Sequence, residues 1–549
     1  MGGDTEKNNT DHLEHPNEAR AQLANLGNAE EHELGKLESL RKYPKASFWC
    51  VYAVWCVLVL SFENQAGGSI LSIPEFRKDF GHFYDGDYVL DTKWQSAFNG
   101  APVASAVIGA LGSGNLADWL GRKTIIMMAL GFSFVGITLE FVATTNEVFF
   151  GGKFINGFAI GALGSVTVTY IGEITPLALR GLFTCLTGLS YTLGPLIVAV
   201  IINETGTLNS RWAYRAVFCG QYGFAVIAAA GIWFMPESPW YLAIKGKQDA
   251  ALKCLAQLGH TGDEGRVRLA VINQTLDQIS SETAGASYLE CFRKSNLRRT
   301  IISISPLCIQ SLSGITFAAS YSTVSLSHHA KKATRLTTYQ YYMQLAGYST
   351  ADSFKLQIVQ QVISLIGNVM SWYLVDRMGR RSLTVNGLAV LTVILLVTGG
   401  LALPGTLATN KGTVALILLY CWWYNVTIGA TAYTVLAEVS TSRLRIKTIA
   451  IGLACQKALE TMWNFVLPYL FNPDKLNLGA KLAFIFGGLS VISLVHLWFN
   501  LPETAGRTYE ELDEMFMKGV PARQFKGYTP EATVRGEAVK TALGKEEEL

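Results

Sequence analysis

Long apolar stretches follow one another along most of the chain, separated by short polar segments. Each stretch is about 20 residues or longer, the length that an α-helix needs to cross roughly 30 Å of hydrocarbon. The predicted fold class is therefore an all-α integral membrane protein. Twelve membrane helices are predicted, at residues 47–68, 95–116, 124–144, 148–171, 182–202, 214–235, 300–326, 354–375, 382–403, 413–437, 446–470 and 479–500.

A polar stretch of about 60 residues divides the twelve predicted spans into two sets of six. Within it, the spacing of Leu252, Leu255 and Leu258 is typical of a short surface helix. The predicted organisation is a cytoplasmic N-terminal tail (1–46), a six-helix bundle (47–235), a cytoplasmic linker with short helices (236–299), a second six-helix bundle (300–500) and a cytoplasmic C-terminal tail (501–549).

Basic residues gather on one side of the predicted spans, which the positive-inside rule makes cytoplasmic. Both termini are therefore expected in the cytoplasm. The loops on the other side are less basic, although the loop after the seventh span, with Lys331, Lys332 and Arg335, runs against this rule. The basic residues that agree with the positive-inside rule are Arg41, Lys42, Lys45, Arg122, Lys123, Arg180, Arg377, Arg380, Arg381, Arg443, Arg445 and Lys447.

Composition supports the membrane assignment and excludes several classes of function. Of the 549 residues, 50% are hydrophobic and only 16% are charged, whereas soluble domains carry nearer a quarter charged residues. The net charge of +3 is too small to indicate a nucleic-acid partner. The nine cysteines form no CxxC pair or metal-ligand spacing. No metal, no cofactor and no enzymatic activity are therefore expected.

Three motifs occur twice in the same order, which is the strongest sequence evidence for the architecture. The loop that begins with Asp118 recurs at Asp376, an offset of 258 residues. Glu173, seven residues before an arginine, recurs as Glu438 at an offset of 265, and the Pro-Glu pair at Glu237 recurs at Glu503 at an offset of 266. The two halves are therefore predicted to be parallel repeats related by an axis along the membrane normal.

These motifs together resemble the sugar porters of the major facilitator superfamily over residues of about 47–516. The resemblance rests on the DxxGRK and DxxGRR loops, the two Glu-(x)6-Arg pairs, PESPW and PETAG. The FENQAGG and PESPWYL segments are most similar to fungal members, including hexose and maltose-type α-glucoside permeases. The resemblance implies a carrier that works by alternating access.

The repeated charges have a mechanical interpretation as a cytoplasmic gate. A carrier must close this side while it is open outward, and ion pairs at helix ends can do so because breaking them there costs little. The alternative is that the charges only fix topology and cap helices, but topology needs the cations and not the paired acids. The predicted gate residues are Asp118, Arg122, Lys123, Glu173, Arg180, Glu237, Asp376, Arg380, Arg381, Glu438, Arg445 and Glu503.

Ionisable residues inside spans cost about 2.5–3.5 kcal/mol each and are functional candidates by default. In the proton-coupled porters that the chain resembles, an acid in the first span faces a base in the fourth. Lys153 matches the base, whereas Gln65 stands at the usual aspartate position and Glu63 lies two residues earlier. The predicted proton-coupling pair is Glu63 and Lys153; a static ion pair or a solvated Glu63 is the alternative. Glu460 is either a second proton site or hydrogen-bonded to its neighbours.

A sugar site needs amides, hydroxyls and aromatic faces near the midplane of the membrane. The seventh span resembles the family's QQLSGIN…Y stretch, which contacts sugar, but Ser311 and Thr316 replace a Gln and an Asn. In the fifth span, Gly188 replaces a sugar-binding Gln. The shorter side chains predict a wider cavity, which fits a ligand larger than a monosaccharide. The predicted sugar contacts are Gln310, Ser311, Thr316, Tyr321, Ser364 and Tyr433.

The predicted function is transport of a hexose or an α-glucoside disaccharide in symport with protons. The expected partners are sugar, protons and the lipid bilayer, with no nucleic acid, and the expected form is a monomer in the plasma membrane. Two alternatives remain open. One is a proton-coupled carrier of another polyol or acid, such as inositol or quinate, and the other is a nutrient receptor that does not transport.

Overall fold

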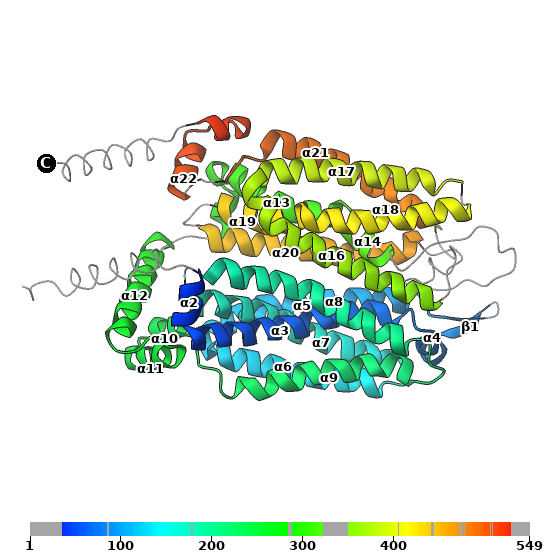
Figure 1. Ribbon diagram of the computed structural model, residues 1–549, viewed down its shortest axis with the longest axis horizontal. Helices are drawn as coiled ribbons and strands as arrows, with labels where there is room; N and C mark the ends of the chain where they lie inside the picture. Colours follow the sequence, from blue (N-terminus) through cyan, green and yellow to red (C-terminus); the bar gives the residue numbers. More distant parts are fainter. Residues whose placement is uncertain are drawn as a thin grey trace, which may run out of the picture.

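A computed structural model shows two bundles of long helices that lie side by side with their axes nearly parallel (Figure 1). It describes residues 36–84, 87–176, 179–283, 288–321, 350–404, 406–440, 444–471, 476, 478–505, 507 and 509–528. Each bundle has its own apolar core, one built mainly from residues between Tyr43 and Ile232 and the other from residues between Ile302 and Leu501.

The N-terminal bundle contains six long helices. Between the first two, a short helix α4 (Pro74–Phe80) leads to a hairpin of β1 (His82–Tyr84) and β2 (Asp87–Val89). The long helices are α3 (Pro44–Ile70), α5 (Thr92–Leu120), α6 (Arg122–Val142), α7 (Asn146–Ile174), α8 (Arg180–Thr205) and α9 (Trp212–Ile232).

The C-terminal bundle also contains six spans, but two of them are each divided into two helices. The elements are α13 (Lys294–Leu312), α14 (Ile315–Tyr321), α16 (Thr350–Met378), α17 (Arg380–Leu401), α18 (Leu407–Val426), α19 (Ile428–Val439), α20 (Arg445–Phe471), η4 (Gly479–Lys481) and α21 (Leu482–Asn500). The predicted uninterrupted helices at 300–326 and 413–437 are therefore wrong in this respect. The first breaks at Gly314, whose φ is +91°, and the second at Thr427, whose φ and ψ are −114° and −101°.

The twelve-span fold predicted from the sequence is confirmed. Among the described residues, ten helical segments are long and apolar enough to cross a membrane. The other two spans, α5 and α20, are as long but less apolar, and they pack along each other at the contact between the bundles. The second contact between the bundles joins α8 and α16. A helix face that meets protein instead of lipid can carry small and polar side chains, which explains the weaker hydropathy of α5 and α20.

Glycines bring α5 and α7 into close contact. A Cβ atom added at Gly157 would lie 2.5 Å from the carbonyl oxygen of Pro102, and one at Gly161 would collide with the backbone of Ala106. Small residues of this kind allow membrane helices to approach backbone to backbone.

Hydrogen bonds and packing join the two bundles at one end. Ser69 of α3 accepts a hydrogen bond of 2.9 Å from Gln357 of α16, and Phe354 of α16 is fully buried in the N-terminal core. The other end, which we call the basic end, carries Arg122, Lys123, Arg380 and Arg381 at the starts of α6 and α17.

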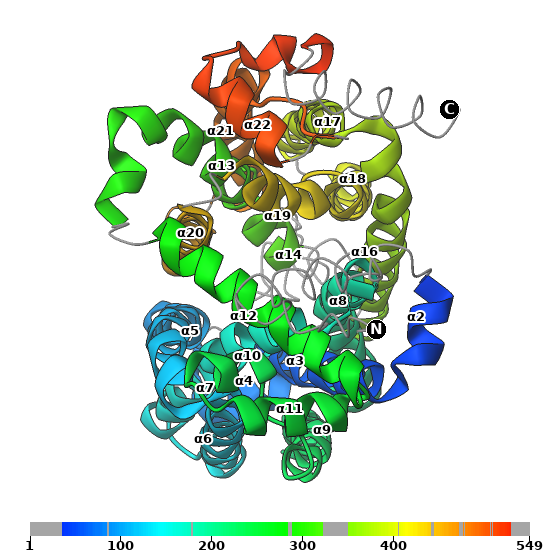
Figure 2. The ribbon, with the colours of Figure 1, turned by 90° about the vertical axis from the view of Figure 1, so that its left-hand side faces the viewer.

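Short helices cover the basic end. The linker forms α10 (Pro239–Ile244), α11 (Gln248–Leu258), α12 (Asp263–Thr283) and η2 (Tyr288–Phe292), and the C-terminal segment forms α22 (Tyr509–Met517) and η5 (Ala522–Gly527). Figure 2 views this end directly and shows α12 running across it, with α2 (Lys36–Lys42) to one side.

The linker is fastened to the start of α3 by a small polar cluster. The Tyr43 hydroxyl donates to Glu264, the Lys42 ammonium lies 3.3 Å from the same carboxylate, and the His260 ring lies 4.5 Å from the Tyr43 ring. Burial lowers the pKa of His260 to about 4, and the positive charges of Arg268 and Lys42 act in the same direction. His260 is therefore neutral in the docked linker.

Docking of the linker should weaken in acid. An undocked His260 binds a proton below its ordinary pKa of 6.5, whereas the docked residue does so only near 4. Between these values the undocked state binds more protons, so stability is lost as pH falls. For residues 248–258, the rate of hydrogen exchange in the unsubstituted protein is divided by the rate in a His260→Gln variant at the same pH. We expect this ratio to be on the order of tenfold higher at pH 5 than at pH 7. An equal ratio at both pH values would contradict this.

Candidate functional site

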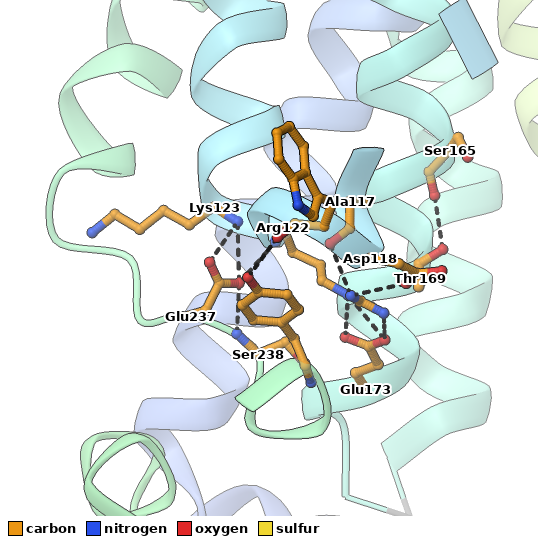
Figure 3. Close-up of polar contacts among 11 residues, drawn as sticks. Ala117, Asp118, Arg122, Lys123, Ser165, Thr169, Glu173, Glu237 and Ser238 are labelled. Atoms are coloured by element: carbon orange, nitrogen blue, oxygen red, sulfur yellow. Dashed lines mark hydrogen bonds and ion pairs between the residues drawn. The ribbon is translucent and has the colours of Figure 1, made fainter. Parts of the chain in front are cut away.

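At the basic end of the N-terminal bundle, two carboxylates contact one buried arginine (Figure 3). Nη2 of Arg122 lies 2.8 Å from Oε1 of Glu173, and Nε of the same guanidinium lies 3.1 Å from Oε2, so the contact is bidentate. Nη1 lies 3.2 Å from the exposed Asp118. Arg122 itself is only 5% exposed.

Glu237 caps the same network from the linker side. Its Oε1 accepts the backbone N–H groups of Arg122 at 2.9 Å and Lys123 at 3.2 Å, which are the first donors of α6. The first N–H groups of a helix lack partners within it and favour a negative charge nearby. Gly121, with φ +97°, leaves room for this approach, because a Cβ there would lie 2.5 Å from Oε2 of Glu237.

The C-terminal bundle repeats this arrangement. Nη2 of Arg380 lies 3.1 Å from Oε1 of Glu438, and Oε1 of Glu503 accepts the backbone N–H of Arg380 at 2.8 Å. Thr504 adds a hydrogen bond of 2.6 Å to Glu438. The duplicated sequence motifs therefore fold into duplicated geometry.

The contacts described for the predicted gate residues lie within each half. Lys123 donates to the carbonyl of Trp233 at 2.9 Å, and Arg381 donates to the carbonyl of Leu501. The side chains of Arg180, Asp376 and Arg445 lie outside the described residues. A gate that closes between the halves remains a prediction.

Deeper in the N-terminal bundle, the predicted pair of Glu63 and Lys153 is in contact. Nζ of Lys153 lies 2.5 Å from Oε1 of Glu63, and the two side chains are 0% and 3% exposed. Lys153 also lies over the rings of Phe149 and Phe218, at 5.6 and 6.0 Å. A side chain at Gly67 would crowd this ammonium, because a Cβ there would lie 3.3 Å from Nζ.

A third charge, which the sequence analysis missed, completes this cluster. Oε2 of Glu140 lies 3.0 Å from Nζ of Lys153, and Glu140 is fully buried. Its Oε1 accepts a hydrogen bond of 3.2 Å from Asn156, whose own oxygen accepts one of 2.9 Å from Ser133. Glu140 lies inside the predicted third span, so its position in the sequence made it a functional candidate for the same reason as Glu63 in the first span.

In the C-terminal bundle, the two broken spans satisfy each other's backbone groups. Gln310 of α13 donates a hydrogen bond of 2.9 Å to the carbonyl of Ile428, just after the break at Thr427. It also accepts a hydrogen bond of 2.9 Å from the amide of Gln456. Tyr420 donates to the carbonyl of Ser313 at 2.8 Å, beside the other break. Unpaired backbone groups are costly at membrane depth, and neighbouring helices supply the partners.

The other predicted sugar contacts lie on four elements of the same bundle, α13, α14, α16 and α19. Ser311 is fully buried, and its hydroxyl has no hydrogen-bond partner among the described residues. Thr316 is half-buried and Ser364 is buried, whereas Tyr433 is half-exposed and its hydroxyl lies 3.4 Å from Gln456. The side chain of Tyr321 lies outside the described residues.

Glu460 pairs with a second charge that the sequence analysis also missed. Nζ of Lys457 lies 2.6 Å from Oε2 of Glu460, one turn along α20. Tyr191 of the N-terminal bundle interacts electrostatically with this pair and with Tyr433. These residues therefore lie where α8 of one half approaches α19 and α20 of the other.

Known proteins resemble this chain over most of its length. The family model described as sugar (and other) transporter matches residues 49–516. The general alpha-glucoside permease of Saccharomyces cerevisiae is 27% identical over 534 residues, 95% of this chain and 83% of the permease. The maltose permease MAL31 of the same yeast is 29% identical over 513 residues, 91% of this chain and 80% of the permease.

Among solved structures, the xylose transporter XylE from E. coli, in a partially occluded inward-open conformation, has the same fold. It superposes with a TM-score of 0.66 at 16% sequence identity, and the match covers 85% of this chain and 100% of XylE.

Removing one partner of the buried Arg122–Glu173 pair should be strongly destabilising. Glu173→Ala leaves the Arg122 charge buried, and we expect a loss of about 3–5 kcal/mol, seen as a lower melting temperature of the purified protein. Asp263→Ala is the control, because its ion pair with Arg266 is exposed on both sides and should contribute nothing measurable. Equal melting temperatures for both variants would be the contrary result.

Proposed function

The chain belongs to the sugar (and other) transporter family, and on this basis we propose that it carries an α-glucoside together with a proton. It is a multi-pass membrane carrier and not an enzyme. The observation that supports the substrate class is the similarity to α-glucoside and maltose permeases over more than nine-tenths of this chain and about four-fifths of each relative.

The buried contact between Glu63 and Lys153 supports proton coupling. At 2.5 Å and with almost no exposure, the contact depends strongly on the charge of each group. A proton bound to Glu63 weakens its attraction to Lys153 and loosens the contact of α3 with α7. Proton binding can therefore change how these two helices pack, which is what coupling requires.

The positions where short side chains replace longer ones support a substrate larger than a hexose. A Cβ atom added at Gly188 on α8 would meet nothing within 4 Å, so open space lies beside this helix. Tyr191, one turn further along α8, is 46% exposed, and Tyr433 on the opposite bundle is 50% exposed. Two exposed aromatic rings on facing bundles can receive the rings of a disaccharide.

The arrangement of the bundles suits alternating access between an inward-facing and an outward-facing state. We place the basic end and both termini in the cytoplasm, because cations favour that side, and the protein in the plasma membrane as a monomer. Gln357, Phe354 and Phe465 connect the bundles at the opposite end. Such contacts at the outer end belong to an inward-facing state, in which the cytoplasmic gate is open.

Uptake measurements in a yeast strain that lacks its own sugar carriers test this function. We expect the expressed chain to accumulate labelled maltose faster at external pH 5 than at pH 7, and a protonophore to abolish the accumulation. Labelled glucose, inositol and quinate are offered in parallel. Preferred uptake of one of these would replace the substrate class, and accumulation that persists with the protonophore would exclude symport.

Filling the space beside α8 should change the size of the preferred sugar. Gly188→Gln places a long amide where the structure has open space, so we expect maltose uptake to fall at least tenfold while uptake of a hexose falls less or rises. Gly188→Ala is the matched control and should transport both sugars nearly as the unsubstituted protein does. An equal loss of both sugars in Gly188→Gln would argue against a site at this position.

A further inference from the structure

The buried cluster around Lys153 contains one cation and two anions. Glu63 lies 2.5 Å from the ammonium and Glu140 lies 3.0 Å from it, and the three side chains are at most 3% exposed. With all three groups charged, the cluster carries a net charge of −1 inside the bundle. An uncompensated buried charge is strongly unfavourable, so the cluster favours binding one proton. The question is which carboxylate holds it.

Glu140 is fixed in the form that suits a permanent anion. The Asn156 amide donates a hydrogen bond to Oε1, and the positive charge of Lys153 lies 3.0 Å from Oε2. Hydrogen bonds donated to a carboxylate favour its charged form. Ser133 in turn holds Asn156 in place.

The backbone around Glu140 is also tightly packed. A Cβ at Gly152 would lie 2.8 Å from Cγ of Glu140, and one at Gly136 would lie 2.7 Å from Cβ of Asn156. Helices α6 and α7 therefore enclose this carboxylate within the N-terminal bundle, away from the contact between the halves.

Glu63 is less constrained. Its Oε1 contacts Lys153. Among the described residues, Oε2 of each carboxylate is buried and accepts no hydrogen bond, but Oε2 of Glu140 lies 3.0 Å from the Lys153 ammonium, so the position left for a proton is on Oε2 of Glu63. Glu63 also lies on α3, which contacts the other half two turns further along through Ser69 and Gln357. A proton on this residue is therefore next to the contact that must change during transport.

We propose that Glu140 is the permanent counter-ion of Lys153, so that Glu63 alone gains and loses the coupling proton. This assignment rests on the proposed symport. In each cycle one proton passes from the outer solution to the Glu63 carboxylate and from there to the cytoplasm, while Lys153 and Glu140 stay ionised. Glu140 is thus a positioning residue, because it acts through the charge of Lys153.

A hydrophobic carbodiimide tests the assignment without any sugar, because it modifies carboxyl groups that carry a proton. The full chain is labelled in detergent at pH 6 and pH 8, and the modified residue is identified by peptide mass spectrometry. We expect modification at Glu63, decreasing towards pH 8, and none at Glu140. Modification at Glu140, or at neither residue, overturns the proposal.

The charge count gives a second, sharper outcome. Glu140→Gln leaves one cation and one anion, so Glu63 no longer needs a proton, and its modification at pH 6 should fall at least tenfold. Glu204→Gln, which removes a carboxylate outside the cluster, is the control and should change nothing. Unchanged modification of Glu63 in Glu140→Gln overturns the proposal.

Two further variants keep the test decisive if Glu140→Gln does not fold. Glu140→Asp keeps both negative charges and should retain modification at Glu63. Glu63→Gln leaves Glu140 as the single anion beside Lys153, and Glu140 should then remain unmodified. The assignment is contradicted if Glu140 is modified in Glu63→Gln, or if Glu63 is no longer modified in Glu140→Asp.

Failure of symport and failure of the assignment give different results. Proteoliposomes with a pH-sensitive dye in the lumen report whether maltose entry carries protons. If the unsubstituted protein moves maltose without protons, the proposed symport is wrong, whereas the labelling pattern alone decides whether the proton of the cluster is on Glu63. If maltose entry does carry protons, Glu140→Gln should reduce proton entry at least tenfold while maltose exchange continues.

Discussion

A charged or unpaired polar group at membrane depth needs a partner within the protein, and this constraint explains most of the internal polar structure. It accounts for the contact of Lys153 with two carboxylates and for the pairing of Lys457 with Glu460. The same constraint acts on the backbone. Beside the breaks that follow α13 and α18, Tyr420 donates to the carbonyl of Ser313 and Gln310 donates to that of Ile428. These charged groups and backbone carbonyls therefore occur in connected sets.

The two halves share their basic-end geometry but differ in their interiors. Arg122 with Glu173 and Arg380 with Glu438 are equivalent pairs, and Glu237 and Glu503 cap equivalent helices. The buried charges around Lys153 occur in the N-terminal half, whereas the broken helices and the Gln310–Gln456 hydrogen bond occur in the C-terminal half. In the proposed function, the N-terminal half therefore holds the proton, and both halves contribute to the sugar site.

The sequence predicted the spans and their grouping into two repeats, because length, apolar content and motif spacing determine these directly. It predicted the contact of Glu63 with Lys153 through the resemblance to proton-coupled sugar porters. It did not predict the breaks at Gly314 and Thr427, because glycine and threonine are common inside spans. A break is stable only where side chains of neighbouring helices bind the backbone groups beside it, and the sequence does not show these contacts. Glu140 and Lys457 were missed although each is an ionisable residue within a predicted span. The partners of Glu140 lie on another helix and the partner of Lys457 lies in the same turn. The pattern of apolar and polar positions alone does not show that either residue forms an ion pair.

The low apolar content of α5 and α20 has a consequence for synthesis. On a ribosome the second span leaves the exit tunnel long before the eleventh exists, so α5 must enter the bilayer without the helix that will later cover its polar face. The glycines at positions 157 and 161 of α7 offer an earlier partner, since they receive the backbone of α5 at close range. The first bundle can therefore form before α20 is made, and one side of α5 is without its protein partner until then.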